Sequence, residues 1–163
     1  MLNMLKNQQR LYQTKFSFGA TSGIITNLGL ITGLETLSHP KLSIIGGILV
    51  IALADNIADS LGVHIYQESE CINEKDAWFS TITNFLARAL ISLTFIFLVA
   101  TLPIKLAVYC SVIWGLALLT IMSYTIAKGR KLNPLPAIFE HVSIAILVIV
   151  ASHLIGKWII SRF

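Results

Sequence analysis

The sequence predicts an all-α integral membrane protein that crosses the bilayer five times. Of its 163 residues, 55% are hydrophobic and only 12% are charged, whereas soluble domains carry about 25% charged residues. Five segments are apolar, or nearly so, over the roughly 20 residues that a helix needs to cross the hydrocarbon layer. We expect helices for all five, because lipid offers no partner to unpaired backbone groups.

These segments and the short links between them leave room for a single domain. The expected spans are residues 16–37, 42–66, 78–102, 104–127 and 136–160. We assign residues 16–163 to this five-helix domain. Leu2, Leu5 and Tyr12 within residues 1–15, followed by Phe16, recur at roughly helical spacing, with Lys6 and Arg10 between them, which is typical of an amphipathic helix on the membrane surface. A frayed polar leader is the alternative.

The basic residues predict an orientation rather than a nucleic-acid partner. The net charge is +4, but most Lys and Arg residues stand at the ends of apolar runs, where they anchor and orient spans. An N-terminus inside and a C-terminus outside puts seven basic residues on the inner side and four on the outer. We therefore expect the N-terminus inside and the C-terminus outside. The expected location is the cytoplasmic membrane of a bacterium or archaeon.

Other chemistry is not indicated. Cys71 and Cys110 show no CxxC spacing, so they predict neither a disulfide framework nor a zinc site. No HExxH or GxSxG motif occurs, and we expect neither enzymatic activity nor a prosthetic group.

Two acids interrupt the second span. Asp55 and Asp59 are four residues apart and lie on one helical face, with Asn56 beside them. A carboxylate at the centre of a span costs on the order of 3 kcal/mol on insertion scales. A bound cation, a shared proton or a basic partner must offset this cost.

Arg88, ten residues into the third span, is the evident partner. One reading is a buried Asp–Arg bridge that holds the helices together. The other is a cation site, because one arginine leaves one acid uncompensated. Hard divalent cations prefer oxygen ligands, and the candidate ligands are Asp55, Asp59, Asn56, Asn27, Ser22 and Thr26.

The end of the second span carries further titratable groups. His64 is a candidate ligand or proton relay, although an interfacial histidine is the alternative. Glu68, Glu70 and Glu74 could concentrate cations at a cytoplasmic mouth through their negative potential. A solvated acidic loop explains them equally.

The first span contains two GxxxG pairs, Gly19/Gly23 and Gly29/Gly33. This spacing lets two helix backbones approach closely. The four glycines predict either a homodimer-facing, path-lining helix or ordinary packing against a neighbouring helix.

Two stretches resemble the vacuolar iron transporter family, which includes the yeast calcium-cross-complementer-type transporters. FGATSGIITNLGLITGL resembles the opening helix of that family, and GGILVIALADNIADSLGVHIYQESE resembles its second helix. Leu61, Gly62, Ser69 and Glu70 match the most recognisable positions. The resemblance implies a five-helix homodimer whose ion path lies between the two first helices, and which exports ferrous iron or a similar ion in exchange for protons.

The chain departs from the family pattern at named positions. Ser22 stands in place of an acid, Asp59 in place of a methionine, and Ile51 where the family has an upstream acid. The long glutamate-rich cytoplasmic helices that bind metal are absent, so the chain resembles a minimal member. Losing the methionine sulfur and gaining a carboxylate keeps manganese as a candidate beside iron.

The sequence thus predicts a proton-coupled exporter of a divalent cation, iron or manganese. Its expected partners are membrane lipid, the transported ion and a second copy of the chain. The alternative is a non-transporting scaffold or accessory subunit with a structural Asp–Arg network.

Overall fold

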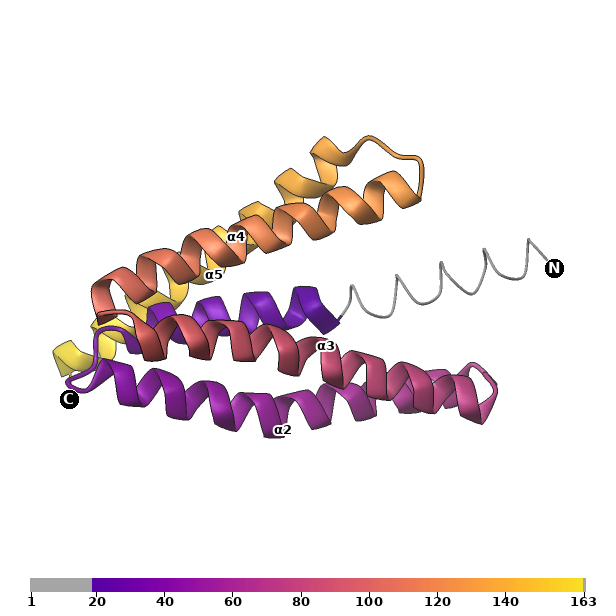
Figure 1. Cartoon of the computed structure of the whole chain (residues 1–163), viewed down its shortest axis with the longest axis horizontal. Helices are drawn as coiled ribbons and strands as arrows, with labels where there is room; N and C mark the ends of the chain where they lie inside the picture. The colour runs from indigo at the N-terminus through magenta and orange to yellow at the C-terminus, as the bar shows by residue number, and fades with distance from the viewer. Residues whose placement is uncertain (1–18, 163) are drawn as a thin grey trace.

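The computed structural model describes residues 19–162, and it is helical throughout apart from short turns (Figure 1). A first helix covers residues 19–34. It is followed by α2 (Pro40–Ser69), α3 (Glu74–Thr101), α4 (Ile104–Gly129) and α5 (Pro134–Arg162). The all-helical prediction is confirmed for this range. The predicted surface helix of residues 1–15 lies outside the described residues.

Helices α2 to α5 are each long and apolar enough to cross a membrane, as predicted for these four spans. Their outer faces carry large apolar side chains, such as Phe139 at 77% and Leu147 at 68% exposure. Exposed apolar surface of this extent marks contact with lipid or with another protein rather than with water. The chain therefore has the features of an integral membrane protein.

The first helix lies between two antiparallel hairpins, α2–α3 and α4–α5 (Figure 1). One end of the bundle contains the turn 35–39 and the C-terminus, and we name it the 35–39 end. The other contains the turn between α2 and α3, and we name it the 70–73 end. Between these ends the first helix touches both hairpins, so it joins them into one bundle.

The two hairpins turn in the same way, at residues 70–73 and 130–133. Each turn has one left-handed residue, Cys71 with φ 54° and Lys131 with φ 58°. In each, the next N–H donates to a carbonyl five residues back, over 3.1 and 2.9 Å, which is the Schellman pattern for ending a helix. An asparagine then accepts from the backbone N–H two residues on, over 2.9 and 3.1 Å. The two hairpins therefore share one turn motif.

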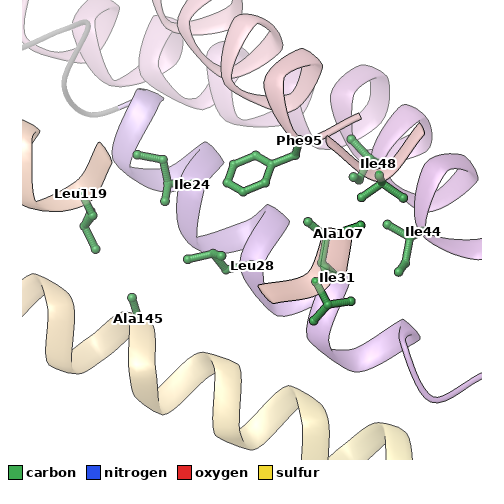
Figure 2. Packing of buried hydrophobic residues seen from close by; sticks show 11 residues of the cluster. Ile24, Leu28, Ile31, Ile44, Ile48, Phe95, Ala107, Leu119 and Ala145 are labelled. Atoms are coloured by element: carbon green, nitrogen blue, oxygen red, sulfur yellow. The ribbon is translucent and has the colours of Figure 1, made fainter. Parts of the chain in front are cut away.

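The apolar core fills the half of the bundle nearest the 35–39 end. Side chains from the first helix, α2 and α3 meet there, and Leu119 and Ala145 approach the first helix from the α4–α5 hairpin (Figure 2). The fully buried members from the first three helices are Ile24, Leu28, Ile31, Ile44, Ile48, Phe95 and Val99. Apolar packing thus dominates this half, while the other half of the α2–α3 interface is polar.

Glycines bring the first helix close to both hairpins. A Cβ at Gly19 would lie 2.8 Å from the backbone oxygen of Asn84 in α3, and Gly23 is buried against α3 as well. The prediction that Gly19 and Gly23 form a dimer interface is wrong, because α3 of the same chain occupies that position. Gly29 and Gly33 pack against α5 but stay half-buried, so their place at an interface remains a prediction.

We predict that Gly156→Ala destabilises the bundle. A Cβ there would lie 2.2 Å from the backbone oxygen of Gly33, and backbone can yield only if the helices separate. Overpacking of this kind costs about 1–3 kcal/mol. Gly46→Ala is the matched control, since nothing lies within 4 Å of its Cβ position. Thermal unfolding in detergent should separate the two variants, and an equal effect of both would contradict the packing described here.

Candidate functional site

Arg88 is the centre of the polar half of the bundle. It lies near the middle of α3 and is 1% exposed. Its Nη2 donates to Asp55, its Nη1 donates to Asp59 and to Ser22, and its Nε donates to Asn56 Oδ1 over 2.8 Å. The guanidinium thus joins α3 to α2 and to the first helix.

The local sequence explains why one side chain reaches both acids. Asp55 and Asp59 are one helical turn apart on α2, so their carboxylates project from the same face. A guanidinium is planar and presents its donors as a fork, which suits it to bridge two carboxylates. We refer to Asp55, Arg88 and Asp59 as the charge cluster, and with two carboxylates on one guanidinium it carries one formal negative charge.

The cluster is buried on one side only. The Asp55 and Asp59 side chains are 48% and 36% exposed, against 1% for Arg88. Ionisable groups inside a span face the bundle interior, a partner or a water-filled cavity rather than lipid. The outer side of these carboxylates is therefore a position for water, a cation or another protein.

A series of polar pairs continues from Arg88 towards the 70–73 end, and we call it the polar ladder. Asn84 donates to Ser60 Oγ over 3.1 Å, and His64 Nδ1 lies 3.1 Å from Thr81 Oγ1. Together with Arg88–Asn56, these pairs are the three rungs of the ladder. Successive rungs lie about one helical turn apart on both helices, or roughly 6 Å at 1.5 Å per residue.

Two of the six predicted ligands do not join the cluster. Asn27 donates instead to the backbone oxygen of Gly23 over 2.7 Å and to Ser92 Oγ over 3.0 Å. Thr26 is half-buried on the first helix and is not among the partners of Arg88. The structure thus gathers Asp55, Asp59, Asn56 and Ser22 around one cation, and that cation is a side chain.

His64 is buried between α2 and α3 rather than placed at an open interface. It is 7% exposed, and its ring centre lies 4.4 Å from that of Trp78. Its Nε2 lies 3.4 Å from Glu68 Oε1, so the polar ladder ends in a carboxylate that is more than half exposed. Glu70 and Glu74 are exposed at the same end of the bundle, and their attraction of cations remains a prediction.

Two buried asparagine oxygen atoms lack a hydrogen-bond partner. Asn27 Oδ1 and Asn84 Oδ1 are buried and accept no hydrogen bond within the described part of the chain. Between residues 19 and 162, no group of three or more His, Cys, Asp or Glu side chains is placed to hold a metal ion. The resident arrangement is therefore the predicted Asp–Arg bridge, and a metal site at these residues stays a prediction.

Asn84, Ser60 and Ser92 are not among the site residues that the sequence predicts. A signal for them existed, since Ser80, Asn84, Arg88 and Ser92 recur every four residues along α3 and are all buried. The polar residues of α2 follow the same spacing at positions 56, 60 and 64. Two polar stripes with one period on consecutive spans indicate that these stripes face each other.

Comparison with known proteins leaves the family open. No family model matches the chain, and no curated protein or solved structure is significantly similar to it. The resemblance to the vacuolar iron transporters therefore rests on the residues of the first two spans alone.

We predict that Arg88→Met destabilises the protein by about 3 kcal/mol, because removing one partner of a buried ion pair leaves charge uncompensated inside the bundle. Replacing both carboxylates as well, in a triple variant with Asp55→Asn and Asp59→Asn, should restore most of the loss. Unfolding in detergent with a denaturant series measures both. If the triple variant is no more stable than Arg88→Met, the carboxylates are not the partners that make Arg88 necessary.

Proposed function

We propose that this chain exports a divalent metal ion, iron or manganese, in exchange for protons, and that Arg88 is a tethered counter-cation in the ion site. The observation that carries the proposal is the position of the guanidinium between Asp55 and Asp59, midway along two spans. The guanidinium occupies the position between the two carboxylates at which a transported cation would bind.

The charges of the cluster suit such an exchange. With Arg88 in place the cluster carries one negative charge, which a single proton neutralises. If the guanidinium withdraws, two carboxylates remain, and their charge equals that of one divalent cation. An arginine stays charged throughout, so it must move rather than deprotonate. The site can then hold Arg88 with a proton, or a metal ion, but not both.

The ligand chemistry supports a hard or borderline metal ion. The side chains around the cluster supply carboxylate, amide and hydroxyl oxygens, which manganese and similar cations accept. The buried oxygen atoms of Asn27 and Asn84 are two further acceptors without a partner in the described part of the chain. The polar ladder extends from the cluster to Glu68, and it supplies a polar route through the α2–α3 hairpin towards the 70–73 end.

The half-exposed carboxylates support the predicted homodimer. Their outer side, together with the half-buried face of the first helix, would be covered by a second copy. The turn motif that the two hairpins share also supports transport, because many transporters consist of similar halves that move against each other around a central site. Here the element between the two hairpins is the first helix.

A second candidate function is that of a membrane scaffold or accessory subunit. It is favoured by the four hydrogen bonds that Arg88 makes to α2 and the first helix. In that case the charge cluster has a structural role, and the guanidinium never leaves its carboxylates.

A flux assay in proteoliposomes with a metal-sensitive dye inside separates the two. We expect uptake of manganese or ferrous ions that depends on a proton gradient, and a decrease of about tenfold or more in Asp59→Asn, since even outer partners of metal ligands contribute 10–100-fold. Glu140→Gln removes an acid elsewhere in the chain and should leave the flux unchanged. Absence of flux of either ion in the wild type, with the protein folded, would favour the scaffold.

A further inference from the structure

The two hairpin turns are alike in backbone but opposite in charge. Only residues 102–103 separate α3 from α4, so both turns lie at the 70–73 end of the bundle (Figure 1). Residues 67–76, around the first turn, contain four acids and one lysine. Residues 127–136, around the second, contain no acid and three basic residues, Lys128, Arg130 and Lys131. We name these three residues the basic tip. Since the two turns have the same backbone motif, the turn itself does not require this difference in charge.

The charges of the basic tip are not used inside the described part of the chain. No ion pair there joins any of its three residues to an acid, although the Lys128 ammonium lies 5.7 Å from the centre of the Tyr124 ring. The side chains are also not needed to end α4, because the backbone N–H groups of residues 130–132 donate to its last carbonyls. All three residues are exposed. Their positive charge is therefore available to an external partner.

Exposed apolar side chains accompany the basic tip. Leu132 in the turn and Leu135 in the first turn of α5 are 57% and 69% exposed, and Tyr124, one turn before Lys128, is 46% exposed. At the end of two spans, apolar side chains can reach the acyl boundary, and aromatic rings are enriched at headgroup level. A soluble polyanion such as RNA would leave the two leucines in water. The combination of cations and leucines therefore favours a lipid surface as the partner.

We propose that the basic tip binds the phosphate headgroups of anionic phospholipids. The planar guanidinium of Arg130 can donate two parallel hydrogen bonds to one phosphate. Lys128 and Lys131 add attraction to the negative potential of the cytoplasmic leaflet, which both turns face under the predicted orientation. The same potential repels the acids of residues 67–76. Bound lipid thus anchors the α4–α5 hairpin and leaves the α2–α3 hairpin, which carries the charge cluster, without a headgroup. This proposal does not rest on the proposed function.

Fluorescence quenching by labelled lipid tests where the headgroups gather. The two turns offer matched positions, because Ile72 and Leu132 each follow the left-handed residue and donate to the carbonyl five residues back. After Cys71 and Cys110 are replaced by serine, a fluorophore is attached at Leu132→Cys or at Ile72→Cys. Phosphatidylcholine vesicles then receive equal small fractions of spin-labelled phosphatidylglycerol or spin-labelled phosphatidylcholine. We expect phosphatidylglycerol to be preferred by about fivefold or more at Leu132, the effect of one basic residue near an anionic surface, and not at Ile72.

Two double variants assign the preference to the basic tip. Arg130→Gln with Lys131→Asn should remove most of the preference at Leu132, and asparagine tolerates the left-handed conformation at that position. Lys105→Gln with Lys157→Gln is the matched control, since it removes the same charge from the same hairpin at the 35–39 end. This control should leave the preference unchanged.

Equal quenching by the two lipids at Leu132 would overturn the proposal, as would a preference that persists in the Arg130 and Lys131 variant. The comparison of Leu132 with Ile72 needs neither double variant, so it decides even if one of them does not fold. Inorganic phosphate should lower the preference no more than sodium chloride of equal ionic strength, which screens the charges alone. A larger effect of phosphate would make the tip a site for the free ion and reject lipid as its partner.

Discussion

One guanidinium between two carboxylates, in the middle of the bundle, is the interaction on which the polar half of this protein depends. Arg88 cannot shed its charge, and Asp55 and Asp59 are costly inside a span unless something compensates them. The structure meets both constraints with one set of contacts, which joins α2, α3 and the first helix. Two carboxylates exceed one guanidinium, so the cluster is not neutral. That excess distinguishes it from a simple structural ion pair.

The bundle is divided into an apolar and a polar half. Towards the 35–39 end, close apolar packing fixes the first helix against both hairpins (Figure 2). Towards the 70–73 end, the α2–α3 hairpin is held by the polar ladder instead. Hydrogen-bonded groups can exchange partners with water or an ion, whereas a packed apolar interface cannot. The polar half is therefore the part of the molecule suited to rearrangement.

The two hairpins share a turn motif but differ in charge. Residues 70–73 and 130–133 end their helices with the same hydrogen-bond pattern, although left-handed Cys71 and Lys131 stand where glycine is usual. Both hairpins also have a histidine–hydroxyl pair near the turn, His64 with Thr81 and His141 with Ser123. Only the α2–α3 hairpin carries the charge cluster. Two similar units with one charged site are thus arranged around a single helix.

The sequence by itself determined that α2 to α5 are apolar and of membrane-spanning length, and it determined which residues share a helical face. Hydropathy and a period of 3.6 residues act within one segment, so they placed Asp55 beside Asp59 and identified Arg88 as the partner. The tertiary structure alone decided what each face meets. It placed Gly19 and Gly23 against α3 rather than a second copy, excluded Thr26 from the cluster, and brought Glu35 to His153 of α5. These outcomes depend on the register and crossing of helices far apart in the chain, which no local periodicity encodes.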